Sequence, residues 1–256
     1  MGYTSKLKAR IKNNVLRISE EQKINIDEKK TAIIFRFLSD NFLNTTYENI
    51  CKNPDWQKRT QKKHTHFEDT LEMQSPNSSD AILMNIFCHP QFTNWIGPHK
   101  LLGIDKDEEI IFGWNPSFEN EKKANSTEID MKIGHRIFES KLTESSFTEK
   151  NLSVVEKYSD FYDVFDQQYL IKESKKGNKI VKNYQLIRNI LTAYKYDLHF
   201  SVLLDSSRID LIKEIMTVIK SLKKEELKNR VDFFTWQEVA NTCGAELKKY
   251  MENKYF

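Results

Sequence analysis

The stretch Thr127-Glu-Ile-Asp-Met-Lys-Ile-Gly-His-Arg-Ile-Phe-Glu-Ser-Lys-Leu-Thr-Glu144 decides the fold of this chain. Its first half alternates isoleucine and methionine with charged residues, which is the two-residue period of a β-strand. A glycine then interrupts the pattern, and a second run rich in β-prone residues follows. We therefore predict two strands, at residues 128–133 and 136–142.

The dipeptide Gly134-His135 between these strands suits a two-residue hairpin turn of type II′, because glycine tolerates the positive φ of its first central position. This turn fixes the register of the hairpin. It places Asp130 opposite Glu139, and the next facing pair outward is Glu128 with Lys141. One face of the hairpin is thus predicted to carry three carboxylates and an ammonium group.

This grouping suits hydrolysis of a phosphodiester. Asp130 and Glu139 would bind Mg²⁺, which prefers carboxylate oxygens and keeps several water ligands. Lys141 would orient or activate the attacking water. Glu128 would add a second metal ligand or pair with Lys141. The alternative is ordinary pairing of opposite charges on an exposed hairpin, but the apolar neighbours on both strands favour a site.

The pair Asp130 and Glu139-Ser-Lys141 resembles the core motif of the PD-(D/E)XK nuclease superfamily, to which many type II restriction endonucleases belong. Residues 127–144, 183–189 and 233–238 also resemble a bacterial group of restriction-endonuclease-like proteins. Ile129 stands where the motif often has proline. The resemblance implies a metal-dependent endodeoxyribonuclease.

The resemblance also implies that the helix following the Glu-x-Lys strand packs beside the site. Gln185 on this helix would hold the attacking water or the phosphate, and Arg188, on the same face, would contact phosphate. The alternative is that Gln185 and Arg188 belong to a solvent-exposed polar face of this helix and contact no substrate. Some members take a further acid from an early helix, and three candidates for it are expected to be surface residues: Glu68, Asp69 and Asp80.

The order of predicted elements indicates an α/β fold with a mixed central β-sheet flanked by helices, similar to restriction endonucleases. A strand at 109–114, a polar loop at 115–126 and the hairpin come first. Helices at 150–165, 180–197, 209–222 and 236–251 then alternate with strands at 198–204 and 231–235. Residues 1–100 are predicted to form a mostly helical N-terminal region and 101–256 the catalytic core, together in one compact domain. Within 1–100, we predict helices at 5–18 and 78–88 and a basic loop at 53–66.

The composition of the chain excludes some classes of protein. The chain has 256 residues, of which 39% are hydrophobic and 30% charged, with a net charge of +3. This balance excludes a polycationic coat protein but not an enzyme that concentrates cations in one cleft. The apolar runs are too short to span a membrane, and three distant cysteines favour a reducing, cytoplasmic location. The histidines lack the paired cysteines of a zinc site.

These observations predict a Mg²⁺-dependent DNA endonuclease, with Mn²⁺ able to replace Mg²⁺. A homodimeric type II restriction enzyme acting on double-stranded DNA is the leading version, because the chain is compact and has no ATPase motif. A repair or defence nuclease of the same fold is one alternative, and a non-catalytic DNA-binding protein is another. A glycosidase using Glu128 and Glu139 is disfavoured by the adjacent lysine.

Overall fold

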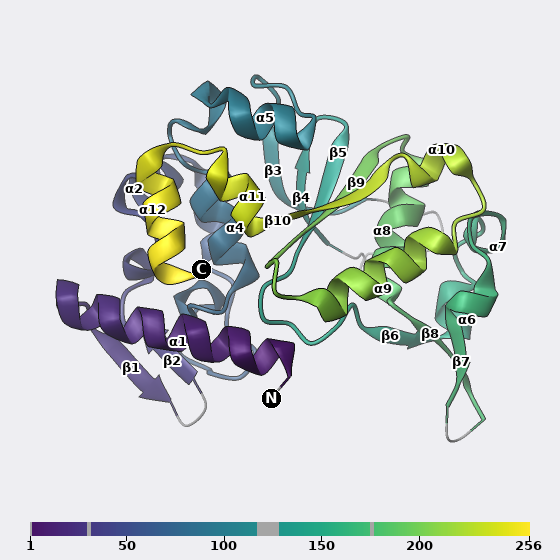
Figure 1. Ribbon diagram of the computed structural model, residues 1–256, viewed down its shortest axis with the longest axis horizontal. Helices are drawn as coiled ribbons and strands as arrows, with labels where there is room; N and C mark the ends of the chain where they lie inside the picture. Colours follow the sequence, from purple (N-terminus) through teal and green to yellow (C-terminus); the bar gives the residue numbers. More distant parts are fainter. Residues whose placement is uncertain (1, 30–31, 117–127, 175–176) are drawn as a thin grey trace.

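A mixed five-stranded sheet lies at the centre of the computed structural model, which describes residues 2–29, 32–116, 128–174 and 177–256 (Figure 1). The strand order is β10-β9-β5-β4-β3, with β3, β4 and β5 antiparallel and β5, β9 and β10 parallel. The strands are β3 (Ile110–Trp114), β4 (Ile129–Ile133), β5 (Arg136–Ser140), β9 (His199–Leu204) and β10 (Val231–Thr235). The predicted mixed sheet flanked by helices is confirmed. Most of the predicted loop at 115–126 lies outside the described residues.

The β4–β5 hairpin has the predicted register, with Met131 facing Phe138 and Ile133 facing Arg136. Gly134 has a φ of 49°, whereas His135 is not among the residues with positive φ, as a type II′ turn requires. A Cβ on Gly134 would also lie 1.7 Å from Glu108 Oε1. Glycine is therefore favoured at this turn by its conformation, and any other residue would also have to displace the Glu108 carboxylate.

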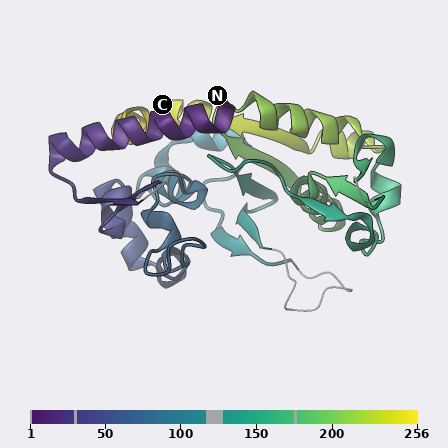
Figure 2. The ribbon, with the colours of Figure 1, turned by 90° about the horizontal axis from the view of Figure 1, so that it is seen from below.

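Three hydrophobic clusters form among the described residues, and the two larger ones lie on opposite faces of the sheet. On one face, Ile137 and Phe200 pack with Ile187 of α8 (Tyr184–Lys195) and with residues of α9 (Ile209–Lys220). On the other, Phe138 packs in a cluster with residues of the N-terminal helix α1 (Tyr3–Gln22), α4 (Ser79–Phe87) and the C-terminal helices. Figure 2 shows α1 running along the same side of the molecule as α9 and the C-terminal helices. The N-terminal region and the core thus share one hydrophobic interior.

Several local predictions were wrong, and pairing or capping explains each. Residues 26–35 form a hairpin, β1 (Ile26–Lys29) with β2 (Ala32–Phe35), within the region predicted to be mostly helical. The basic loop contains α3 (Pro54–Thr60), which starts because Asn53 Oδ1 accepts the backbone N–H groups of Asp55 and Trp56. The predicted C-terminal helix breaks before Gly244 into α11 (Trp236–Asn241) and α12 (Ala245–Lys254).

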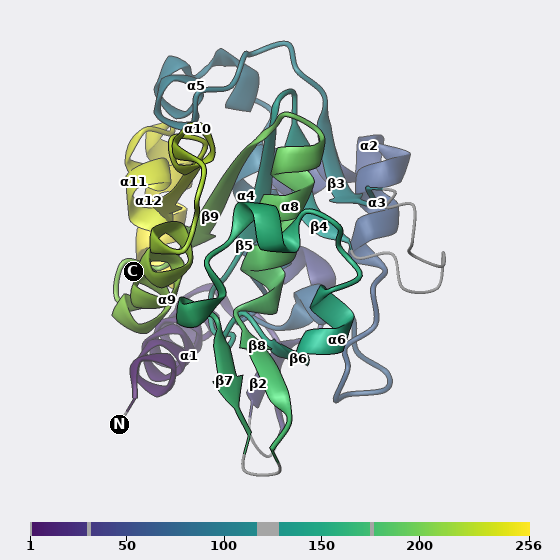
Figure 3. The same cartoon turned by 90° about the vertical axis from the view of Figure 1, so that its right-hand side faces the viewer.

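A second small sheet interrupts the region between β5 and α8. Its order is β6-β8-β7, formed by β6 (Glu149–Asn151), β7 (Ile171–Glu173) and β8 (Lys179–Lys182). It replaces the ends of two predicted helices, and only the short helices α6 (Leu152–Val155) and α7 (Phe161–Val164) remain between β6 and β7. Figure 3 shows the β7–β8 hairpin projecting from the body of the molecule, with β8 leading toward α8.

The remaining helices are α2 (Asn44–Lys52), α5 (Ile96–Leu102) and α10 (Glu225–Lys228), with 3-10 turns at Leu38–Asn41, Glu72–Gln74, Phe92–Asn94 and Gln167–Tyr169. The predicted helix at 78–88 is observed as α4, and Ser78 caps it, since its side chain accepts the N–H of Ala81. Across the described parts of the chain, none of the helices combines the length and the apolar character needed to cross a membrane.

Candidate active site

Asp130 and Glu139 lie on adjacent strands, one from β4 and one from β5. Asp130 Oδ2 accepts the backbone N–H of Ser140 at 2.7 Å, which holds this carboxylate against the end of β5. Burial raises the pKa of Asp130 well above its ordinary value, and the negative charges of Glu139 and Asp80 raise it further. The positive charge near Asp130 therefore does not fully offset the negative charges gathered around it.

Glu139 is only 2% exposed, and both its oxygens have partners. Lys141 Nζ lies 2.7 Å from Oε1, and Asn189 Nδ2 donates to Oε2 at 2.7 Å. Burial alone would raise the pKa of Glu139, but the charges of Lys141 and Arg188 and these two hydrogen bonds hold it below the ordinary value. Glu139 is thus an ionised carboxylate at neutral pH.

Lys141 is 5% exposed and lies within the acid cluster. Besides Glu139, its Nζ donates to Gln185 Oε1 at 3.2 Å. Burial opposes its charge, but Glu139, Glu144 and Asp130 together raise its pKa above the ordinary value. Lys141 is therefore a fixed ammonium group. In the ion-free protein it can donate hydrogen bonds and neutralise charge, but it is not a free base.

Helix α8 supplies the second layer of the site. Gln185 and Asn189 lie four residues apart, so one face of the helix reaches both Lys141 and Glu139. Arg188, 4% exposed, donates to Asn189 Oδ1 at 2.9 Å and to the backbone oxygen of Glu128 at 3.1 Å. These bonds direct the Asn189 amide nitrogen toward Glu139. Sequence reasoning missed Asn189, although its spacing from Gln185 was a usable signal.

Glu128 does not pair with Lys141, which was one of its two predicted roles. Its carboxylate contacts Arg59 of α3, while Lys141 pairs with Glu139. Strand β4 begins only at Ile129, so Glu128 precedes the strand, and its side chain is 40% exposed. The structure therefore separates Glu128 from the cluster of Asp130, Glu139 and Lys141.

Asp80 was expected at the surface, and this expectation was wrong. It is 4% exposed, in the first turn of α4, and its Oδ2 lies 2.9 Å from Arg59 Nη2. Glu68 and Asp69 are exposed, as expected. Its charge raises the pKa of Asp130, so of the three early acids Asp80 is the one whose charge reaches the pair of Asp130 and Glu139.

The residues fit a hard divalent cation bound through few protein ligands. The described residues contain no ready-made cluster of three or more His, Cys, Asp or Glu side chains for a metal. The neighbouring carboxylates of Asp130 and Glu139 nevertheless supply oxygen donors, and Asp80 Oδ2 is buried without a well-directed hydrogen bond among described residues. Mg²⁺ commonly takes one or two carboxylates and completes its shell with water and phosphate oxygens.

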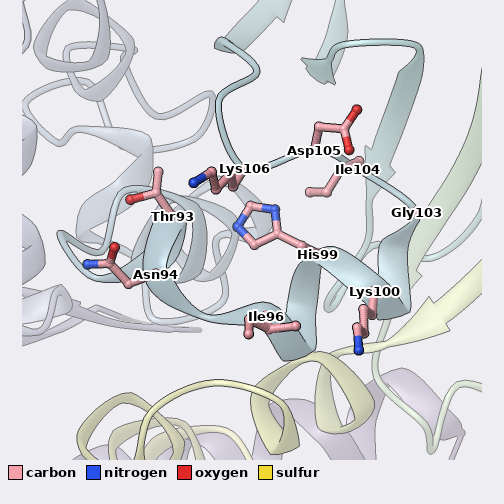
Figure 4. A pocket seen from close by; sticks show the side chains of 9 residues that line it. All are labelled: Thr93, Asn94, Ile96, His99, Lys100, Gly103, Ile104, Asp105 and Lys106. Carbon is pink, nitrogen blue, oxygen red and sulfur yellow. The ribbon is translucent and has the colours of Figure 1, made fainter.

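One cavity, of about 800 Å³, lies between α3 and β3; Trp56, Lys58, Arg59, Lys62 and Glu128 are among its lining residues. Another, of about 630 Å³, lies around α5 (Figure 4). His99 lines it, but His99 Nε2 is 3.1 Å from the backbone oxygen of Phe92 and serves the local fold. Of these two cavities, the first includes Glu128 and its partner Arg59 in its lining, and the second includes none of the predicted site residues.

Comparison with known proteins gives one family. The family model described as "Restriction Endonuclease associating with ARP" matches residues 6–256. No curated protein and no solved structure matches the chain significantly. Because the match covers nearly the whole described fold, including the acids and α8, the chain belongs to the restriction-endonuclease family REase-ARP.

Proposed function

We propose that this protein is a Mg²⁺-dependent endonuclease that hydrolyses phosphodiester bonds in double-stranded DNA, with Mn²⁺ able to replace Mg²⁺. The observation that carries the proposal is the cluster of Asp130, Glu139 and Lys141, in which the buried Glu139 carboxylate pairs with the buried Lys141 ammonium at 2.7 Å. The set resembles the core of the PD-(D/E)XK nucleases. Its presence in a restriction-endonuclease family supports a type II restriction enzyme as the specific role.

Asp130 and Glu139 are the residues that would hold the ion, with Asp80 beside them. A bound Mg²⁺ supplies Lewis acidity and lowers the pKa of a bound water. Lys141, fixed as an ammonium, stabilises negative charge on the phosphate and orients the attacking water. Gln185 and Asn189 hold Lys141 and Glu139 from α8, so the charged groups are positioned before the substrate arrives.

Cations near the acids support DNA as the substrate. Lys58 and Lys62 line the cavity beside Glu128. Lys179 and Lys182 are exposed on the β7–β8 hairpin, which leads into α8 (Figure 3). Phosphate contacts by lysine and arginine provide most of the non-specific affinity for DNA. These lysine side chains would bind the phosphates of the DNA duplex while the acids contact one of its two DNA strands.

The oligomeric state can be inferred from the number of candidate active sites in each chain. Each chain carries one set of acids with one lysine, so cutting both strands at a palindromic sequence is most simply done by a two-fold dimer. We therefore propose a homodimer on DNA.

The test is digestion of a DNA of known sequence with Mg²⁺, followed by mapping of the ends. Asp130→Ala and Glu139→Ala should abolish cleavage and Lys141→Ala should reduce it by several orders of magnitude, all with DNA binding retained. Lys132→Ala is the matched control, because this lysine lies on β4 but contacts the Trp114 ring instead of the acids. Wild-type rates in the folded Asp130 and Glu139 variants, or full activity in excess EDTA, would refute the proposal.

A further inference from the structure

Arg59 occupies a cation position between two acids that come from different parts of the fold. It extends from α3, and its side chain is 8% exposed. Its Nη2 lies 2.9 Å from Asp80 Oδ2, and its Nη1 contacts the Glu128 carboxylate. The charge of Asp130 also acts on it. One guanidinium therefore pairs with two carboxylates and lies within the electrostatic influence of Asp130.

The edge strand β3 is built to leave room for this guanidinium. Gly113 has a φ of 67°, and a Cβ there would lie 2.8 Å from Arg59 Nη1 and 3.2 Å from Glu128 Cδ. The positive φ requires glycine here, and the absence of a side chain also leaves the Arg59–Glu128 pair undisturbed against the strand.

The hydrogen bonding of this arginine is nevertheless incomplete. Arg59 Nη2 lies 3.1 Å from Asp80 Oδ1 and 2.9 Å from Asp80 Oδ2, so both oxygens share one nitrogen, while the buried Nε of Arg59 has no hydrogen-bond partner among the described residues. A buried polar atom without a partner is unfavourable. The arrangement neutralises Asp80 but leaves its oxygens able to exchange Arg59 for a better ligand.

On these grounds, and resting on the proposed function, we propose that Arg59 is the resident counter-cation of the site. It competes with the divalent ion for Asp80, the acid beside the proposed ion ligands, and ion binding releases its guanidinium toward the adjoining cavity. Arg59 itself lines that cavity together with Lys58 and Lys62, so the released group joins the cations that meet the phosphates of the substrate. Arg59 is therefore a residue that couples ion binding to substrate binding.

The competing explanation is a permanent clamp that joins α3, α4 and the start of β4. The two explanations differ in sign. A competitor slows or weakens ion binding, so its removal makes ion binding tighter. A clamp holds the acids together, so its removal leaves ion affinity unchanged or makes it weaker.

The first experiment measures Mn²⁺ binding to the whole protein without DNA, by the electron paramagnetic resonance signal of free Mn²⁺. Arg59→Met keeps the aliphatic stem and removes the charge. We expect it to bind Mn²⁺ about tenfold more tightly or better, because a unit positive charge next to the acids is removed. Arg17→Met is the control, since Arg17 pairs with Glu21 on the exposed face of α1, and its affinity should equal that of the wild type.

A second measurement uses the wild-type protein and does not depend on the folding of a variant. Arginine labelled with ¹⁵N gives an Nε–H resonance for Arg59, assigned by its loss in Arg59→Lys. Saturating Mg²⁺ should shift this resonance and leave that of Arg17 unchanged. If Mg²⁺ binds but the Arg59 resonance does not move, the proposal is wrong.

The outcomes separate this inference from the proposed function. If the wild type cuts DNA with Mg²⁺ but folded Arg59→Met binds Mn²⁺ as the wild type does, or less tightly, only the inference about Arg59 fails. If neither protein binds Mn²⁺ and neither cuts DNA, the metal-dependent function itself fails, and the inference fails with it.

Discussion

Replacing Asp130 by asparagine isolates the electrostatic crowding of the site, because the two side chains have nearly the same shape. The asparagine oxygen can still accept the N–H of Ser140, which Asp130 accepts at 2.7 Å. What disappears is one negative charge beside Glu139 and near Asp80. The ion-free variant should therefore be more stable than the ion-free wild type.

The size of this gain follows from the hairpin. Facing residues in a β-hairpin have Cβ atoms roughly 5 Å apart, and two like charges at that distance repel by about 3 kcal/mol at an effective dielectric constant of about 20. Lys141 offsets part of this repulsion, because it lies within the same cluster. We expect a net gain of about 1–2 kcal/mol, which corresponds to a rise in Tm of about 2–8 °C for a chain of this size.

The gain should depend on pH in a defined direction. The folded protein raises the pKa of Asp130 above the ordinary value of 3.8, so the folded state holds this proton more tightly than the unfolded state. Wild-type stability is therefore lost as pH rises through the interval between the ordinary and the folded pKa. The advantage of Asp130→Asn should be absent below this interval, grow across it and level off above it.

The assay is thermal unfolding of both proteins in EDTA from pH 4 to pH 8, repeated with Mg²⁺. Mg²⁺ should raise the Tm of the wild type by mass action and raise that of the variant much less. The reasoning is refuted if the ion-free variant is equally or less stable at pH 8, or if the difference in Tm does not change with pH.

Three further predictions concern the same site. Ser140→Ala should lower the cleavage rate by less than about tenfold, because the backbone N–H that holds Asp130 remains. The substitution removes only the 3.0 Å hydrogen bond from Ser140 Oγ to the backbone oxygen of Ser79. A loss of cleavage as large as that of Lys141→Ala would place the Ser140 hydroxyl in the chemistry. Ca²⁺ should support DNA binding with little cleavage, because its looser coordination positions water poorly, and rapid cleavage in Ca²⁺ measured by gel electrophoresis would contradict the mechanism. Light scattering of the protein on DNA should give two chains per duplex, and double-strand cleavage by a complex with one chain would rule out the dimer.

The hairpin and its register followed from local sequence. Alternation of apolar and charged residues identified β4, and Gly134 fixed the turn, so the neighbours Asp130 and Glu139 could be paired by counting along two strands. Such information lies within about a dozen consecutive residues and needs no knowledge of the rest of the chain. The succession of strands and helices after the hairpin similarly predicted the mixed sheet.

Other parts of the fold depended on pairing between distant segments. Strand β8 was predicted as the start of a helix, but it pairs with β6 and β7. Strand β6 lies 20 or more residues away along the chain, and β7 lies about eight residues away. The short sequence of β8 is compatible with a helix or a strand, and pairing with its neighbouring strands makes it a strand. The hairpin β1–β2 was also missed, although its two strands are adjacent in the chain.

The site itself was divided in the same way. Sequence alone predicted the acids, the lysine and their neighbouring strands, because these relations are local. Only the tertiary structure decided that Asp80 is buried and its charge acts on Asp130, that Asn189 holds Glu139, and that Glu128 turns to Arg59. Each of these relations joins side chains that are 50 or more residues apart. Their partners are selected by which helix packs on which face of the sheet, a choice made by the whole hydrophobic core and not by the residues in contact.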